Sequence, residues 1–222
     1  MPVRFATKDD VGTMARISSE AFWDDELFGE VIHPYRDQHP DGPRLYWLAL
    51  IRKGWQDPAN TFLVSTTGDE KNKVAAWAQW TRKGRKETAA DEDSMRKQVE
   101  WPALPPNEAA HPERITYLER SYDHISHQWT GAREQAYDIA ILATLPSHQG
   151  EGHGKALMQW GIQRATSEQV PISVISALGK DGFYNKLGFT IPAGNAQDGE
   201  GNPLAGLVEG GNIWWKEDHL KA

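Results

Sequence analysis

The chain has 222 residues, of which 31 are acidic and 24 are basic, so its formal net charge is −7. This length fits one domain of ordinary size, and the acidic balance argues against binding nucleic acid through a broad basic surface. The absence of cysteine excludes disulfides, thiolate nucleophiles and thiolate-bound metal centres. The sequence contains neither the apolar run of a signal peptide nor a stretch long enough to cross a bilayer, so we expect a cytoplasmic protein without membrane contact.

Strands and helices alternate in the first 80 residues. Asp9 and Asp10 offer N-caps to a run with helical spacing, and a polar connection that contains Gly68 separates two β-rich runs, as in a β-hairpin. The pattern predicts, in chain order, a strand at 3–6, a helix at 11–21, a segment of helix or loop at 27–34, a helix at 45–55 and a β-hairpin made of 61–66 and 73–80.

The composition changes between Thr81 and Gly131. Charges cluster in the first part of this segment, four prolines follow between Pro102 and Pro112, and helical spacing runs from Ile115 to Trp129. We therefore predict one domain over residues 1–222 with an insertion at about 82–130. Two interpretations stay open, a solvated connection and a lid, because long loops inside compact domains are often functional.

A strand, a glycine-rich loop and a helix follow one another after the insertion. Residues 137–144 have strand composition, residues 149–154 read Gln-Gly-Glu-Gly-His-Gly, and helical spacing continues from Lys155 to Thr166. Glycines let a ligand approach the backbone, and the first-turn amides of a helix attract phosphate oxygens. A P-loop would need a hydroxyl residue at Ala156, and a dinucleotide fingerprint would need a small residue at Lys155. The remaining pattern is Gln-x-x-Gly-x-Gly.

Two other site classes find little support in the sequence. His124 and His127 lie about one helical turn apart without a third ligand nearby in the sequence, and no His-x-x-x-His pair is present, so we expect no zinc site. A Gly-x-Ser-x-Gly element is also absent, which argues against a serine hydrolase.

Three ordered segments resemble one protein family. Leu142–Leu157 resembles the pyrophosphate motif, Gln/Arg-x-x-Gly-x-Gly/Ala, of the GNAT superfamily of acyl-CoA-dependent N-acyltransferases. Gly182–Phe189 is similar to the family's Tyr-x-x-x-Gly-Phe signature, and residues 3–22 are similar to its first strand and helix. The resemblance implies an α/β fold with a mixed, mostly antiparallel central sheet that is splayed in the middle and carries helices on both faces.

The resemblance also implies acetyl-CoA as co-substrate, without a metal. The backbone of Leu142 and Thr144 would face the thioester and the pantetheine, where amide donors could stabilise a developing oxyanion. Glu151 departs from the basic residue often found in this loop, and its charge should weaken phosphate binding. The residues implied to hold the pyrophosphate are Gln149, Gly150, Gly152, His153, Gly154 and Lys155.

Tyr184 and Asp138 are the two candidate catalytic side chains. Tyr184 matches the tyrosine of the family signature, which resembles a general acid for the departing thiolate; the alternative is that it only packs the short helix before Gly188. Asp138 falls where the histone-acetyltransferase branch of the family places a glutamate that resembles a general base, and its shorter side chain implies a water relay. The alternative is a strand-end aspartate that lies in solvent or pairs with an arginine.

The expected activity is therefore direct transfer of an acetyl group from acetyl-CoA to a primary amine of a small molecule. A homodimer, which is common in this fold, is expected as well. Two alternatives stay open. A protein or peptide N-acetyltransferase would need an open groove, and a non-catalytic acyl-CoA-binding sensor or interaction module would keep the fold without turnover.

Overall fold

A seven-stranded sheet organises the chain in this computed structural model, which describes residues 1–69, 72–84 and 99–220. The strand order is β1-β2-β3-β4-β5-β7-β6, and the described pairs are antiparallel except for the parallel pair of β4 and β5. The strands are β1 (Val3–Phe5), β2 (Asn60–Thr66), β3 (Val74–Lys83), β4 (Ala136–Thr144), β5 (Ile172–Ser176), β6 (Ile191–Asn195) and β7 (Asn212–Lys216). The predicted mixed, mostly antiparallel sheet is thus confirmed.

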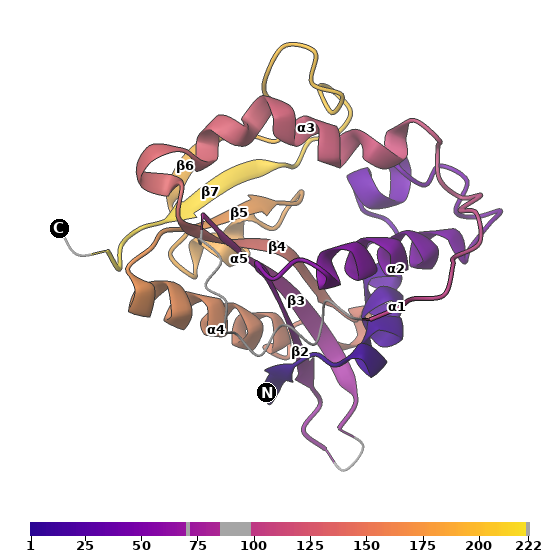
Figure 1. Cartoon of the computed structure of the whole chain (residues 1–222), viewed down its shortest axis with the longest axis horizontal. Helices are drawn as coiled ribbons and strands as arrows, with labels where there is room; N and C mark the ends of the chain where they lie inside the picture. Colours follow the sequence, from indigo (N-terminus) through magenta and orange to yellow (C-terminus); the bar gives the residue numbers. More distant parts are fainter. Residues whose placement is uncertain (70–71, 85–98, 221–222) are drawn as a thin grey trace.

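Helices cover both faces of this sheet (Figure 1). The helices are α1 (Val11–Ala21), α2 (Gly42–Trp55), α3 (Tyr117–Ile125), α4 (His153–Glu168) and α5 (Asp181–Asn185). Alternate residues of a strand point to opposite faces. Phe62 and Val64 of β2 belong to the core beneath α1 and α2, whereas Leu63 belongs to the core beneath α4. None of the helices among the described residues has the length and apolar character needed to span a membrane.

Most of the elements expected from the sequence are present, with shifted bounds. The hairpin of β2 and β3 is confirmed, with residues 70 and 71 of its connection outside the described residues. Helix α4 begins two residues before the expected start at Lys155, so His153 and Gly154 belong to its first turn. The open segment at 27–34 forms a π-helical turn at Glu26–Val31. The helical run expected at 115–129 consists of α3 between two short 3₁₀ turns.

A β-bulge in β4 changes which side chains face which helices. Ile139 pairs with Trp80, and Ile141 pairs with Gln79, so Ala140 is the extra residue. Before the bulge, Ile139 packs in the core beneath α4; after it, Ile141 packs in the core beneath α1 and α2. The bulge therefore reverses which face of the sheet each side chain in the second half of β4 points to.

The sheet opens between β4 and β5. Their parallel ladder consists of three pairs, Tyr137 with Ile172, Asp138 with Ser173 and Ile139 with Val174. β4 continues to Thr144 and β5 continues to Ser176, but no further pair between the two strands follows within the described residues. The predicted splay in the middle of the sheet starts immediately after Ile139.

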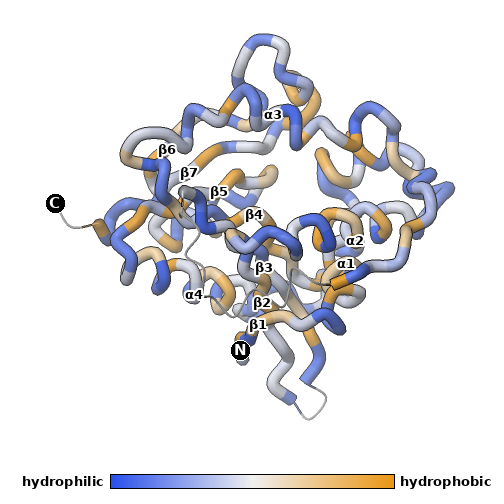
Figure 2. The backbone as a smooth tube through the Cα atoms, in the orientation of Figure 1, coloured by the Kyte–Doolittle hydropathy of each residue, from blue (hydrophilic) through white to orange (hydrophobic). Residues whose placement is uncertain are grey.

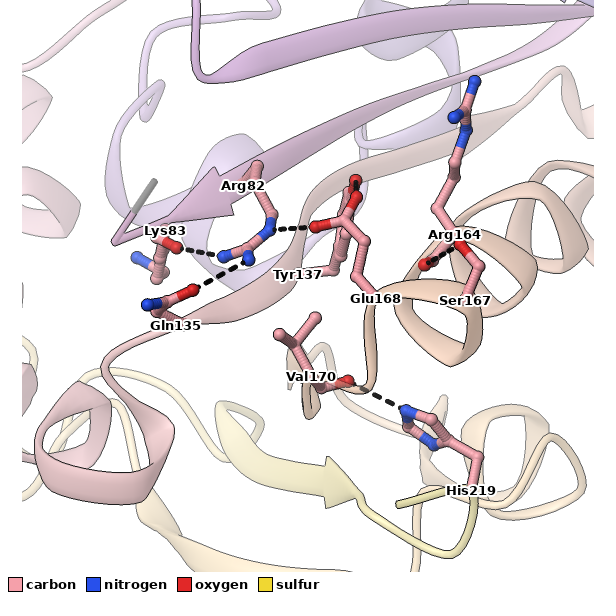
Figure 3. A network of polar contacts seen from close by, with 9 residues as sticks. All are labelled: Arg82, Lys83, Gln135, Tyr137, Arg164, Ser167, Glu168, Val170 and His219. Atoms are coloured by element: carbon pink, nitrogen blue, oxygen red, sulfur yellow. Dashed lines mark hydrogen bonds and ion pairs between the residues drawn. The ribbon is translucent and has the colours of Figure 1, made fainter. Parts of the chain in front are cut away.

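An ion pair between a buried arginine and a partly exposed glutamate fixes the C-terminal end of α4 to the sheet (Figure 3). Arg82 Nε of β3 donates to Glu168 Oε2 at 2.8 Å, and the Tyr137 hydroxyl donates to Glu168 Oε1 at 2.6 Å. Arg82 also donates to the side chain of Gln135 at 3.1 Å. The Arg82 side chain is 10% exposed, so Glu168 supplies the counter-charge that a buried guanidinium requires.

The described part of the 82–130 insertion lies against the rest of the domain. Trp101 packs edge-on against Trp55 of α2, with 6.4 Å between ring centroids, and Arg52 donates to the carbonyl of Pro102 at 2.8 Å. Helix α3 is mostly hydrophilic (Figure 2) but places Ile125 in a core cluster that also contains Trp215 of β7. The lid role stays a prediction, and residues 85–98 of the insertion lie outside the described residues.

Candidate active site

The loop between β4 and α4 is built on glycines that adopt left-handed backbone conformations. Gly150 has φ +83° and Gly152 has φ +94°, and no atom lies within 4 Å of the Cβ that either position lacks. Conformation rather than crowding therefore requires glycine at these two positions. Gly152 is also the N-cap of α4, so the turn directs the chain into the helix.

The first turn of α4 has backbone N–H groups available for an anion. The Ala156 amide donates to the carbonyl of Gly152 at 3.0 Å, which begins the helical pattern. Among the residues that the structure describes, no side chain caps this helix. The amides of His153, Gly154 and Lys155 precede the intrahelical bonds, and the helix dipole adds partial positive charge at this end.

Gly154 brings the loop against the open half of β4. A Cβ at this position would lie 3.6 Å from the ring of Phe183, 3.8 Å from Leu142 Cδ2 and 3.8 Å from Thr144 Oγ1. These are ordinary contacts, so the fold itself does not demand glycine here. Leu142 and Thr144, which the family resemblance implies at the thioester, thus lie beside the predicted pyrophosphate loop. Gln149 and Lys155 are exposed at the two ends of that loop.

A cluster of two histidines and a glutamate lies within this loop. His153 is fully buried, and its Nδ1 lies 2.8 Å from the hydroxyl of Ser65 on β2. Glu151 Oε2 lies 3.0 Å from His148 Nδ1 and 3.4 Å from His153 Nε2. Burial lowers the pKa of His153, against the opposing effect of Glu151. The sequence pattern gave no sign that the His153 side chain is buried, because Ser65 is 88 residues away.

Tyr184 lies in the core beneath α4. Its ring packs edge-on against Phe183 and Phe189, with centroid separations of 5.1 and 5.8 Å. Burial raises the pKa of the Tyr184 phenol well above its usual range, so the hydroxyl keeps its proton at neutral pH. Gly188 has φ +92°, as expected for a left-handed residue after a short helix. Packing and proton donation are both compatible with this position.

Asp138 is buried on the opposite side of β4. The hydroxyl of Ser173 donates to Asp138 Oδ1 at 2.5 Å, and Trp129 Nε1 donates to the same Ser173 oxygen at 2.9 Å. Burial raises the pKa of Asp138, partly opposed by Lys83 and by the Ser173 hydrogen bond. Asp138 is only 3% exposed, which is at odds with the solvated strand-end alternative. Its described hydrogen-bond partner is a serine rather than an arginine.

The comparisons with known proteins bear on the segment that contains these residues. A family model described as an acetyltransferase (GNAT) domain matches residues 119–191, from α3 through β4, the glycine loop, α4, β5 and α5 to the start of β6. Over this segment the chain is similar to the GNAT superfamily.

Individual relatives agree with this family. A protein from Stachybotrys chartarum (strain CBS 109288 / IBT 7711) that is named an acetyltransferase is 28% identical over 196 residues, which is 85% of this chain and 80% of that protein. A structure from Corynebacterium glutamicum ATCC 13032, described as histone acetyltransferase HPA2 and related acetyltransferase, has a TM-score of 0.59 and 21% identity over 96% of this chain and 94% of that one. A PaiA N-acetyltransferase from Thermoplasma acidophilum, solved in complex with coenzyme A, has a TM-score of 0.52 and 10% identity, with 97% of each chain covered. The two structures show likeness of fold.

The GNAT fold thus gathers the predicted residues at two places. The loop residues lie beside Leu142 and Thr144 at the N-terminal end of α4. Tyr184 follows Phe183, whose ring lies beside Gly154. Asp138 lies at the last parallel pairs before the splay, on the face covered by Trp129. Trp129 was one of three tryptophans, with Trp23 and Trp101, that we expected at the acceptor site, whereas Ser173 was not expected there, because only the fold brings it to Asp138.

Proposed function

We propose that this protein is a GNAT N-acetyltransferase that transfers the acetyl group of acetyl-CoA directly to a primary amine of a small molecule. One observation supports the proposal above all. The N-terminal turn of α4, which no described side chain caps, lies beside Leu142 and Thr144, in the part of β4 that has separated from β5. An opened strand edge beside an anion-binding helix end can hold an extended molecule that carries a pyrophosphate. The named complex of the Thermoplasma N-acetyltransferase with coenzyme A concerns a protein of similar fold and is in keeping with this proposal.

The ligand contacts we propose depend mainly on the backbone. The segment Gln149–Lys155 holds the pyrophosphate through loop and first-turn amides, and the backbone of Leu142 and Thr144 faces the thioester and the pantetheine. Amide donors directed at the thioester carbonyl stabilise the negative charge that develops on its oxygen. This arrangement suits a chain of net charge −7, because it needs no field of lysines.

The proposed reaction has one tetrahedral intermediate and no covalent enzyme intermediate. The neutral amine attacks the thioester carbon, so a C–N bond forms and the C–S bond then breaks. The amine proton passes to Asp138 through a water relay, and the Tyr184 hydroxyl gives a proton to the departing thiolate. The buried carboxylate, with its raised pKa, suits proton acceptance, and the phenol, protonated at neutral pH, suits proton donation.

The side chains packed around Asp138 favour a small amine as the acetyl acceptor. Trp129 is hydrogen-bonded to Ser173, and the Lys83 ammonium lies 4.7 Å from the Trp129 ring centroid and 5.6 Å from that of Tyr122. These side chains come from the described part of the 82–130 insertion and from β3. They lie on the side of Asp138, which is only 3% exposed to solvent. In our proposal the insertion acts as a lid that leaves room for a small amine rather than for a peptide.

The test is incubation of the protein with acetyl-CoA and a panel of amines. The panel contains a polyamine, an arylamine, an amino acid and a lysine-containing peptide; a thiol reagent detects released CoA, and mass spectrometry detects the acetylated product. The protein has no cysteine, so it gives no background with the reagent. Acetylation of a small amine supports the proposal. Turnover with the peptide alone, or tight acetyl-CoA binding without any turnover, would overturn it in favour of a protein acetyltransferase or of a sensor.

A further inference from the structure

Three metal-ligating side chains converge at the start of α4. One ligand atom from each of His148, Glu151 and His153 lies within 4.8 Å of the other two. The three residues come from a 3₁₀ turn, the glycine loop and the first helical residue. The sequence predicted no zinc site, because it contains no histidine pair at the spacing of a helical zinc motif; here the turn of the loop brings the ligands together.

One ligand atom of this cluster is buried without a hydrogen bond. In the described part of the chain, Nε2 of His153 is shielded from solvent and has no hydrogen-bond partner. Its near polar neighbour is Glu151 Oε2, at the ion-pair distance of 3.4 Å. A buried polar atom without a partner is costly, and an atom directed at a carboxylate is well placed to share a bound cation with it.

We propose that His148, Glu151 and His153 bind one divalent transition-metal ion, with zinc as the best match. Two imidazoles and one carboxylate form a His₂Glu ligand set, which binds zinc in a site with an open fourth position. Calcium and magnesium prefer all-oxygen ligands, so this set disfavours them.

Two of the three separations in the cluster are close to those of a zinc site, and the third, between the two histidines, is within 4.8 Å. Zinc–ligand bonds of about 2.0–2.2 Å in a tetrahedron place ligand atoms about 3.3–3.6 Å apart. The separations are 3.0 Å between His148 Nδ1 and Glu151 Oε2, and 3.4 Å between Glu151 Oε2 and His153 Nε2. The Glu151 side chain is 46% exposed and that of His148 is 31% exposed, so both have room to rotate toward an ion.

Ser65 supplies the outer contact that orients a metal-binding histidine. Its hydroxyl lies 2.8 Å from His153 Nδ1, so this nitrogen can carry the imidazole proton while Nε2 offers its lone pair to the ion. Histidine ligands in metal sites regularly have such a partner on the second ring nitrogen. A bound divalent ion would also make the net charge of the cluster positive. The cluster would then attract a pyrophosphate instead of repelling it, a consequence that rests on the proposed function.

The test measures binding of the metal alone, without CoA or an acceptor. The protein, freed of any histidine tag and treated with a chelator that is then removed, is titrated with Zn²⁺ in a calorimeter and with Co²⁺ in a spectrophotometer. We expect one equivalent of each ion to bind, with the visible absorption of tetrahedral Co²⁺. His148→Ala and Glu151→Gln should each weaken zinc binding at least about 10–100-fold, the loss typical of removing even an outer partner.

The controls separate a metal site from a cluster held by hydrogen bonds alone. His127→Ala removes a histidine outside the cluster and should leave zinc binding unchanged, and circular dichroism verifies that each variant is folded. Ser65→Ala should weaken binding without abolishing it. Failure of the wild-type protein to bind one equivalent of zinc would overturn the proposal, as would binding that survives both His148→Ala and Glu151→Gln. Neither result bears on whether acetyl-CoA is a substrate.

Discussion

Ser173 donates a hydrogen bond to Asp138 across the parallel ladder of β4 and β5, one pair before the two strands separate. The carboxylate therefore lies at the closed end of the splay, and Trp129 holds the same serine from the side of the insertion. A carboxylate in such surroundings is desolvated, and its pKa is raised. This relationship leads to two predictions, one on activity and one on stability.

Asp138→Asn tests the role of a general base. The amide keeps the size and can still accept from Ser173, but it cannot take a proton. We expect kcat/KM to fall by roughly 100- to 10,000-fold, and the acidic limb of the pH–rate profile to disappear. In the wild type this limb should lie at higher pH than for an ordinary aspartate, because burial raises the pKa of Asp138. An unchanged profile in the variant would leave water as the base.

The same substitution should change how stability depends on pH. Because its folded-state pKa is raised, Asp138 holds its proton to higher pH in the folded chain than in the unfolded one. Its contribution to stability is therefore full below the unfolded pKa of about 3.9 and is lost as the pH rises through the folded pKa. Urea unfolding from pH 4 upward should show Asp138→Asn gaining stability relative to the wild type. The exposed Asp123, changed to Asn, should give no comparable gain.

The surroundings of Asp138 also mark a limit of prediction from the sequence. The glycine loop could be predicted because its residues are neighbours in the chain and their spacing carries the signal. The partners of Asp138 could not, because Ser173 is 35 residues away and the bulge at Ala140 follows from the register between β3 and β4. The splay itself was expected from the family resemblance. Hydrophobic periodicity predicts that a strand forms, but it does not show where the pairing of two strands ends.

Tyr184→Phe tests the general acid. The ring keeps its packing against Phe183 and Phe189, so we expect unfolding to change little. The rate of CoA release should fall by roughly 100-fold or more at every pH, because the thiolate then departs without its proton donor. Tyr46→Phe, which removes the hydroxyl of another buried tyrosine on α2, is the matched control and should keep the wild-type rate. A rate equal to wild type in Tyr184→Phe would assign this tyrosine to packing alone.

Gly154→Ala tests whether this glycine makes room for the ligand. The added methyl group meets only ordinary contacts in the protein, and alanine favours a helix over glycine by about 0.5–1 kcal/mol, so thermal stability should not fall. The affinity for CoA should fall about tenfold or more, equivalent to about 1.4 kcal/mol. Calorimetric titration with CoA measures this affinity. Gly12→Ala changes the same helical position of α1, where nothing lies within 4 Å, and should bind CoA as the wild type does.

Glu168→Ala tests the ion pair that fixes the end of α4. The substitution leaves the buried Arg82 without its carboxylate partner and takes away the acceptor of the Tyr137 hydroxyl. We expect the free energy of unfolding to fall by about 2–3 kcal/mol, measured by urea unfolding at pH 7. The control is Glu20→Ala on α1, because the Arg16–Glu20 pair is about half exposed and such surface pairs contribute about 0.3–0.5 kcal/mol. Equal losses in the two variants would mean that the Glu168 pair stabilises the fold no more than a surface pair, and that α4 is held mainly by its apolar face.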